Sequence, residues 1–418
     1  MNSNRLITLI TCILITGILY AQDTTNGYHY PTYKGLVMAG YQGWFNTPTD
    51  GAGRSWHHFQ RRNVFAPGSC EIDLWPDMTE YQKQYPTDFK FSDGKTATVF
   101  SAYDKSTVDL HFKWMKDYGI DGVFMQRFVA EIRSASGKHH FNTVLENAMQ
   151  AAKLNNRAIC IMYDLSGMNP QDVSLVLNDI DELNKKYGLL NKDSIISPTY
   201  LHHNGRPLVT VWGVGFNDNR RYGFTEADKI IDGLNQRGYS VMLGVPTYWR
   251  DFGFDAIKSD SLHTLIKKCA IAAPWFVGRY EMKDYPKFHQ HIVDDMKWCK
   301  DNNVDYVPLA FPGFSWRNMN GPNARTIDRE NGNFFWQQVA GAKQANASML
   351  YIAMFDEMNE GTSIFKCATK SNLPLNPKGV LVEIDDSLKS DYYLWLAGQA
   401  ANWFHGDKKY SAIKPVRN

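Results

Sequence analysis

Short apolar segments of strand type alternate with longer amphipathic segments of helical type from about residue 108 onward in this 418-residue chain. Near-continuous apolar runs of this length are typical of parallel strands that are covered on both faces. With one earlier run, about eight occur, at 35–42, 122–128, 158–165, 207–216, 240–249, 270–278, 306–314 and 348–355. Strands that alternate with helices about eight times predict a closed (β/α)8 TIM barrel.

Helix patterns fill the segments between these runs. The first, 106–119, begins with Ser-Thr, which favours an N-cap, and ends on Gly119. Further helices are expected at 141–155, 170–188, 225–238 and 285–303, and a closing helix at 387–406. An open doubly wound sheet is the alternative fold. It would normally carry a Gly-rich phosphate loop after its first strand, and the "GAGRSW" motif found there fits neither known fingerprint.

Residues 43–107 lack the strand-helix rhythm and are rich in Trp, Pro, Gly and Asp. An irregular insertion of this length is typical of a functional loop or cap. After the first strand of a barrel, it is expected to lie over the C-terminal face. No repeat or low-complexity linker interrupts the rest, so we expect residues 22–418 to form one (β/α)8 domain.

The N-terminal residues 1–21 are predicted to be a cleaved signal peptide. Arg5 precedes a continuous apolar stretch, and Ala21 is a suitable last residue before cleavage. A membrane anchor is the alternative, but the stretch is short for a span and lacks a basic stop-transfer flank. No later segment is apolar enough to cross a membrane, so we expect a secreted or periplasmic protein.

Five cysteines follow this segment, an odd number without CxxC spacing, which does not indicate a disulfide framework. Cys160 and Cys269 lie in or beside apolar runs and are expected to be buried thiols. The three His doublets lack the spacing of a metal site, and Ser166 does not lie in a nucleophile elbow. We therefore expect no metal and no cofactor.

Charge and aromatic content narrow the class of ligand. The chain has 45 basic and 43 acidic residues, a net charge of +2, which indicates no nucleic-acid partner. Aromatic residues make up 14% of the chain. That content suits a large core and an aromatic-lined carbohydrate cleft equally well.

Polar and aromatic residues gather where the predicted strands end, which is the active-site face of a (β/α)8 barrel. Each has a structural alternative, such as an ion pair between Arg127 and a helix acid, but their convergence on one face favours a carbohydrate substrate. The expected substrate-binding residues are Tyr41, Gln42, Trp44, Gln126, Arg127, Tyr163, Asp164, Trp212, Tyr248, Trp249, Arg279, Trp316 and Asp356. For Asp356, support of the neighbouring Glu357 is the alternative to a substrate contact.

The eighth run leads into three crowded acids, Asp356, Glu357 and Glu360. Glycosidic cleavage usually needs two carboxyl groups, one protonated and one ionised, and crowding separates their pKa values. Glu357 and Glu360 can share a site if the strand ends near 356, because residues i and i+3 meet on a turn and diverge on a strand. Gly361 permits such a turn. The alternative is a solvated strand end in which one Glu bonds loop amides.

Four segments together resemble glycoside hydrolase family 99, the endo-α-mannosidases, and the related family 71. They are "GYQGWF", "YGIDGVFMQRF", "NGRPLVTVWG" and "FDEMNEGTSI". The resemblance implies a (β/α)8 barrel and a retaining glycosidase. In such enzymes the first Glu of the pair is a base on the sugar 2-hydroxyl, which attacks the anomeric carbon to give a 1,2-anhydro sugar. The second Glu is general acid and then general base, and by position these roles fall on Glu357 and Glu360.

The chain departs from the family pattern at Asp356, at 358–359 and in its long insertion. A pentose substrate, an α-glucan and an α-mannan therefore stay open. Two other classes stay open as well. One is a non-catalytic carbohydrate-binding barrel that keeps the aromatic cleft, and the other is a hydrolase or lyase that uses the same acids on another sugar linkage.

Overall fold

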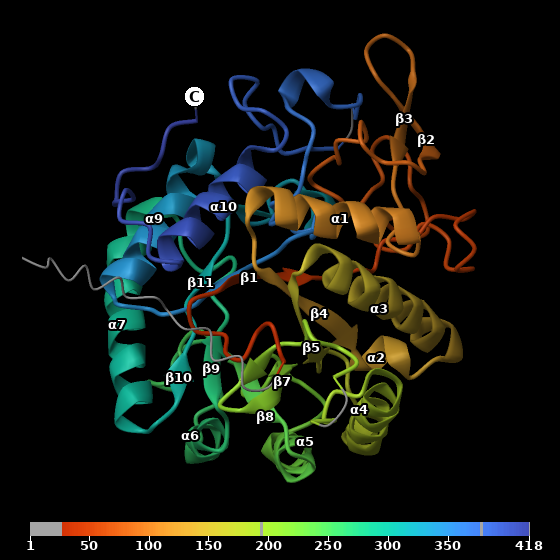
Figure 1. Ribbon diagram of the computed structural model, residues 1–418. Helices are drawn as coiled ribbons and strands as arrows, with labels where there is room; N and C mark the ends of the chain where they lie inside the picture. The colour runs from red at the N-terminus through yellow and green to blue at the C-terminus, as the bar shows by residue number, and fades with distance from the viewer. Residues whose placement is uncertain (1–26, 193–194, 377–378, 418) are drawn as a thin grey trace, which may run out of the picture.

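The structure, a computed structural model, describes residues 27–192, 195–376 and 379–417. The predicted signal peptide, residues 1–21, lies outside the described residues. The apolar runs form a ring of parallel strands in the order β10-β9-β8-β7-β5-β4-β1-β14-β11 (Figure 1). Their bounds are β1 (Val37–Tyr41), β4 (Gly122–Phe128), β5 (Ala158–Asp164), β7 (Arg206–Trp212), β8 (Ser240–Val245), β9 (Ile271–Pro274), β10 (Asp305–Tyr306), β11 (Leu309–Ala310) and β14 (Leu350–Ile352).

The seventh predicted run, 306–314, closes this ring in two pieces. β10 pairs in parallel with β9, whereas β11 pairs in parallel with β14. Pro308 separates the pieces because it has no N–H to donate to a ladder. Its carbonyl still accepts from Tyr351 N at 3.0 Å. The run was expected to be one strand and is instead split, but the ring is closed and the predicted barrel is confirmed.

Helices surround the ring of strands (Figure 1). The longer helices bury their apolar faces against the outer side of the strands, as the amphipathic patterns predict, whereas the short α8 packs on the insertion through Asn318. Their bounds are α1 (Lys105–Tyr118), α2 (Val129–Ile132), α3 (Ala135–Asn155), α4 (Val173–Tyr187), α5 (Phe224–Arg237), α6 (Asp260–Lys267), α7 (Tyr285–Asp301), α8 (Arg317–Asn320), α9 (Asn333–Gln344) and α10 (Tyr392–Phe404).

Helix ends follow the sequence signals in part. Gly119 ends α1 in the left-handed region, with φ of 84°, as predicted. The predicted Ser-Thr cap of α1 is wrong, because the helix begins at Lys105 after Asp104. The Asp104 carboxylate does not cap either, since Lys83 and Tyr85 donate to it at 2.8 Å and 2.7 Å.

The helix expected at 141–155 is longer than predicted. It begins at Ala135, because the Ser134 hydroxyl caps it and accepts from Gly137 N at 3.0 Å.

The insertion after β1 covers the C-terminal face, as expected. It contains one hairpin, β2 (Tyr85–Lys90) and β3 (Thr96–Val99), and is otherwise irregular. Asp73 N and Leu74 N donate to Met358 O at 3.0 Å and 3.3 Å, and Ala368 N donates to Trp75 O at 2.8 Å. The insertion therefore packs directly on the loop that follows β14.

Smaller elements complete the fold. β6 (His202–His203) pairs antiparallel with β7, and β12 (Phe314–Ser315) forms a hairpin with β13 (Thr326–Ile327). Cys160 and Cys269 are buried free thiols, as expected. Within the described residues, no helix has both the length and the apolar character needed to cross a membrane.

Candidate active site

The three acids lie in a tight loop after the last barrel strand. β14 ends at Ile352, and the chain then folds back on itself, with Met354 N donating to Thr362 O at 3.2 Å and Phe365 N to Phe355 O at 3.1 Å. Gly361 adopts φ of 64° in this loop, which is the turn that the sequence predicts. Glu357 and Glu360 thus lie on a turn at the C-terminal end of the barrel.

Glu357 is held from two sides. Gln42 Nε2, from the end of β1, donates to Glu357 Oε1 at 2.5 Å. Thr362 Oγ1, from the returning arm of the loop, donates to Oε2 at 2.8 Å. The side chain is buried, with 3% of its surface exposed. Its orientation is therefore fixed by the fold before any substrate binds.

Asp356 joins the same two elements through the backbone. Its two carboxylate oxygens accept from Gln42 N at 2.7 Å and Gly43 N at 2.9 Å. The residue is completely buried. The predicted substrate contact by Asp356 is therefore wrong, because backbone amides already occupy this carboxylate.

Glu360 is the more open acid, half-buried at the mouth of the barrel. The Trp316 side chain acts to lower the pKa of its carboxyl group. Ser315 N donates to the Glu360 carbonyl at 2.8 Å. Asp164, at the end of β5, lies close enough for its charge to act on Glu360. The end of β5 and the loop after β14, which are separated in the ring by β4 and β1, thus both contribute acids here.

Burial raises the pKa of every member of this cluster. The pKa of Glu357 is well above its usual range because of burial and the Glu360 charge, while Thr362 and Gln42 act to lower it. Burial raises the pKa of Glu360 to about 7, and the Asp164 charge adds to the rise. Burial also raises the pKa of Asp356 to about 6, against its two backbone donors. The cluster therefore retains protons near neutral pH.

The interior of the barrel contributes a residue that the sequence reasoning missed. Tyr351 on β14 points inward; burial raises the pKa of its phenol well above the usual range, and the charges of Glu357, Asp164 and Asp356 add to the rise. In the sequence it looks like one more core residue. Gly40 is a sequence feature linked to Tyr351, because any side chain there would clash: a Cβ on Gly40 would lie 2.2 Å from Tyr351 Oη. The sequence does not show that these two residues are neighbours.

Aromatic rings continue from Tyr351 along the inside of the barrel. Trp275 lies 6.5 Å from the Tyr351 ring and 5.3 Å from the Trp212 ring, measured between centroids. Tyr351, Trp275 and Trp212 line a small internal cavity.

Six predicted substrate-binding residues present buried polar atoms that have no hydrogen-bond partner within the described part of the chain. They are Gln42 Oε1, Trp44 Nε1, Gln126 Oε1, Arg127 Nη1, Trp212 Nε1 and Arg279 Nε. Burying such an atom without a partner is unfavourable by about 1–3 kcal/mol, so a group of them at the strand ends calls for a ligand.

Other predicted contacts face the helices instead. Arg127 is buried and pairs with Asp179 on α4, with Nε to Oδ2 at 2.8 Å, and Tyr163 donates to the same carboxylate at 2.7 Å. Gln126 points inward, so its neighbour Arg127 must point outward, because side chains alternate along a strand. The predictions for Arg127 and Tyr163 are therefore wrong.

The predictions for two further aromatic residues, Tyr41 and Trp249, are also wrong, because both side chains are buried against helices. Tyr41 is completely buried and bonds His111 Nδ1 of α1 at 2.8 Å. Trp249 is completely buried and donates to Asp295 on α7 at 3.1 Å. Both side chains pack between the strands and the helices, where they cannot contact a sugar.

The remaining predicted residues lie at the rim. Trp44 stacks on His58 at 3.8 Å and on Phe128 at 5.0 Å. Arg279 pairs with Asp255 at 3.1 Å, and Asp255 also accepts from Tyr248 N at 3.0 Å. Trp316 is 37% exposed. A substrate contact by Trp44, Tyr248, Arg279, Trp316 or Asp164 stays a prediction.

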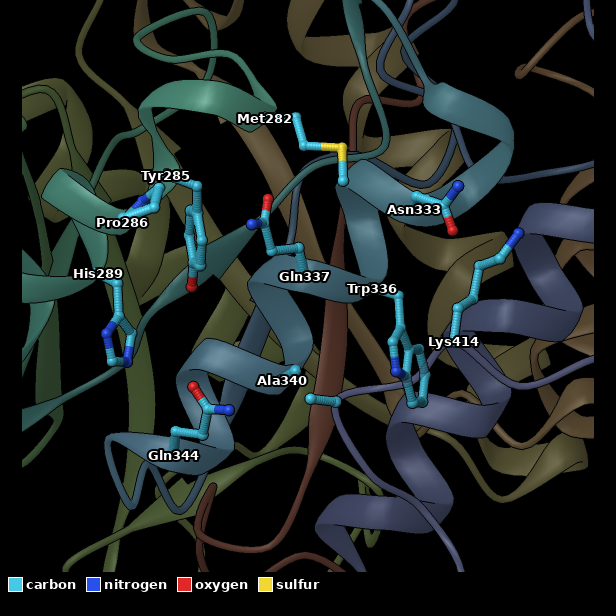
Figure 2. Close-up of a pocket in the computed structure, with 11 residues that line it drawn as sticks. Met282, Tyr285, Pro286, His289, Asn333, Trp336, Gln337, Ala340, Gln344 and Lys414 are labelled. Atoms are coloured by element: carbon cyan, nitrogen blue, oxygen red, sulfur yellow. The ribbon is translucent and has the colours of Figure 1, made fainter.

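Two grooves lie apart from the acids. One, of about 480 Å³, runs between α7, α9 and residues 412–414, and Figure 2 shows Gln337 and Trp336 among its lining residues. Another, of about 1030 Å³, lies beside the β2–β3 hairpin and residues 366–373 and 388–391. Over residues 27–192, 195–376 and 379–417, no three His, Cys, Asp or Glu side chains are grouped to hold a metal ion.

Comparison with solved structures identifies the fold. The chain aligns with the GH99 endo-α-mannosidase of Bacteroides thetaiotaomicron in complex with bis-tris-propane, with a TM-score of 0.65 and 16% sequence identity. The alignment covers 89% of this chain and 98% of that one. The chain has a family 99 glycoside hydrolase fold. A glycoside hydrolase-like protein also aligns, with a TM-score of 0.50 and 12% identity over 78% of this chain and 92% of that one.

Sequence comparison shows distant homology to the same group. Over 89 residues, 21% of the chain, the sequence is 33% identical to glycoprotein endo-α-1,2-mannosidase of Mus musculus and of Rattus norvegicus. The match spans about a fifth (19%) of the length of these curated relatives. No protein-family model matches the sequence.

Proposed function

We propose that this protein is a retaining glycoside hydrolase that cleaves an α-linked glycan, with mannose as the favoured sugar. The observation that carries the proposal is the pair Glu357 and Glu360 on one turn at the C-terminal face of the barrel, with pKa values raised by burial. Glycosidic cleavage requires one protonated and one ionised carboxyl group, and such a pair supplies both.

The order of the two acids in their motif, which resembles family 99, assigns the roles: Glu357 is the base and Glu360 the acid. Glu357 accepts from both Gln42 and Thr362, and these donors act against the rise in its pKa that burial and the Glu360 charge cause. Burial and the Asp164 charge raise the pKa of Glu360 to about 7, which suits an acid that gives up its proton near neutral pH.

In the first step, Glu357 takes the proton of the sugar 2-hydroxyl, and O2 forms a bond to the anomeric carbon. The glycosidic C–O bond breaks, and Glu360 gives its proton to the leaving oxygen. In the second step, Glu360 takes a proton from water, whose oxygen bonds the anomeric carbon. The C1–O2 bond breaks, and Glu357 returns its proton to O2. Both carboxyl groups end in their initial states, and the anomeric configuration is retained.

This chemistry restricts the sugar. O2 can attack the anomeric carbon from behind only if O1 and O2 are trans across the ring bond. α-Mannosides and α-arabinofuranosides meet this condition, whereas α-glucosides and α-xylosides do not. The mannosidase relatives support mannose between the two remaining sugars.

Digestion of a glycan panel tests the proposal. Wild type, Glu357→Gln, Glu360→Gln and the surface control Glu330→Gln are incubated with α-mannan, α-glucan and α-arabinan, and products are followed by anomer-resolved NMR. We expect cleavage of α-mannan with retention, lost about 100- to 10,000-fold in both active-site variants and unchanged in the control. Glu360→Gln should recover on a substrate with an activated leaving group, because that group needs no acid. Binding of mannan without cleavage by wild type would instead identify a carbohydrate-binding barrel.

We also propose that the enzyme acts outside the cytoplasm, on the basis of residues 1–21. Mass spectrometry of the protein recovered from its native cells should give an N-terminus at Gln22. Recovery of the chain with its first residues intact would contradict export by cleavage.

A further inference from the structure

Gln42 connects the first and last strands of the barrel at the proposed base. Its backbone N–H donates to Asp356 at 2.7 Å, and its side-chain amide donates to Glu357 at 2.5 Å. The residue is 5% exposed. One residue thus makes bonds with two neighbouring acids that lie more than 300 positions away in the sequence.

Asp356 supplies the anchor for this arrangement. It is completely buried and accepts from Gly43 N as well as from Gln42 N. Two backbone bonds to one carboxylate fix both the position and the direction of the chain after β1. Because the backbone at Gln42 is fixed in this way, its side chain is directed toward Glu357.

The amide of Gln42 has one oxygen left over. Since Nε2 faces the Glu357 carboxylate, Oε1 must point elsewhere, and it finds no hydrogen-bond partner within the described residues although it is buried. A buried amide oxygen without a partner is an unmet acceptor. A sugar hydroxyl beside the base is the donor that would meet it.

We propose that Gln42 is the positioning residue of this active site: anchored by Asp356, it orients Glu357, favours the ionised form that a base needs, and accepts a hydroxyl of the bound sugar through Oε1. This inference rests on the proposed function and assigns to it a group outside the pair of acids. Asp356 supports the base through its bonds to Gln42 N and Gly43 N, and its charge also acts on Glu357.

Among the described residues, the titratable groups that act on this pair of acids are themselves acidic or phenolic. Glu360 and Asp356 come from the same loop as Glu357, Tyr351 from β14, and Asp164 from β5 acts on Glu360. With acids on these sides, the ionised form of Glu357 depends on its two donors, Gln42 and Thr362. Removing the Gln42 donor should therefore raise the pKa of Glu357.

Gln42→Leu, which removes both amide atoms at similar volume, tests the proposal against wild type and the control Gln337→Leu. Gln337 lines the distant groove of Figure 2. On α-mannan we expect Gln42→Leu to lower kcat/KM roughly 10- to 100-fold, the range for a bond to a charged group. The acidic limb of its pH–rate profile should move to higher pH, and the control should match wild type. A loss without movement of this limb would overturn the positioning role.

Asp356→Asn, alone and with Gln42→Leu, tests the anchor. If Asp356 acts through Gln42, the double variant should lose no more than about twofold beyond Gln42→Leu alone, whereas independent roles would multiply. If Asp356→Asn fails to fold, Gln42→Asn tests the positioning instead, because it keeps the amide on a side chain too short to reach Glu357. It should lose activity, and the acidic limb of its pH–rate profile should move to higher pH as in Gln42→Leu.

A readout that needs no activity separates this inference from the proposed function. The protein is labelled with ¹³C at the glutamate carboxyl carbons, and the Glu357 signal is assigned by its absence in Glu357→Gln. Its titration midpoint should rise in Gln42→Leu and stay in Gln337→Leu. If wild type is inactive but the midpoint rises in Gln42→Leu, the hydrolase proposal is refuted and the positioning role of Gln42 is supported. If wild type is active but the midpoint does not rise, the hydrolase proposal is supported and the positioning role is refuted.

Discussion

Replacing Glu360 with Gln is expected to stabilise the folded protein at pH 8 and to leave its stability unchanged near pH 4. The pKa of Glu360 is raised from 4.5 to about 7 in the folded state, chiefly by burial. Between these values the folded protein holds a proton that the unfolded chain has released. The stability of wild type should therefore fall as the pH rises from about 4.5 to 7.

The size of the effect follows from the pKa. One unit corresponds to about 1.4 kcal/mol, so the full rise amounts to roughly 3 kcal/mol. Glu360 is half-buried and interacts with Glu357, so solvent screening reduces this figure. We expect Glu360→Gln to gain about 1–2 kcal/mol at pH 8, because the amide carries no charge to bury.

Calorimetric melting of wild type, Glu360→Gln and Glu330→Gln at pH 4, 6 and 8 measures the effect. Glu330 is an exposed acid and should show no gain that depends on pH. A gain of equal size at every pH would mean that packing, and not the buried charge, causes it. A loss at pH 8 would refute the reasoning, because it would mean that the ionised carboxylate stabilises the fold.

Three further substitutions test individual contacts. Asp179→Asn should lower the free energy of unfolding by about 3–5 kcal/mol in urea, because it leaves the Arg127 guanidinium buried without its ion pair; a loss below about 1 kcal/mol would contradict the assignment. Gly40→Ala should lower both stability, by about 1–3 kcal/mol, and kcat, because its Cβ would lie 2.1 Å from Met354 Cε and 2.2 Å from Tyr351 Oη. Melting and kinetics measure the two, and unchanged values would show that both side chains are free to move. Asp73→Asn should speed proteolysis within 43–104, because Asp73 accepts from Arg317 N and Asn318 N at 3.0 Å each and so fastens the insertion; an unchanged cleavage rate would show that other contacts hold it.

The barrel and the turn could be predicted because their signals are local. A buried parallel strand needs an apolar run, and a tight turn needs a residue such as Gly361 that tolerates positive φ. The split at Pro308 is also local chemistry, since proline has no N–H, but its consequence is not. Only the ring shows that the two pieces pair with different neighbours, β9 and β14.

The sequence does not show whether a side chain at a strand end points to the barrel interior or to the surrounding helices. Side chains alternate along every strand, but a strand that is apolar on both faces gives no pattern from which to decide which residue points inward. Gln126 and Arg127 are adjacent, and only one can face the site. The same ambiguity explains the wrong predictions for Tyr41 and Tyr163, whereas Trp249 lies in the turn after β8.

The sequence by itself determined the ring of strands, the covering insertion and the pair Glu357 and Glu360, because each depends on residues that are near one another in the chain. Tertiary structure alone decided the role of Asp356. Its partners, Gln42 and Gly43, come from the opposite end of the chain and become neighbours only when the last strand closes the barrel against the first. Closure of the ring creates this contact, and no local pattern encodes it.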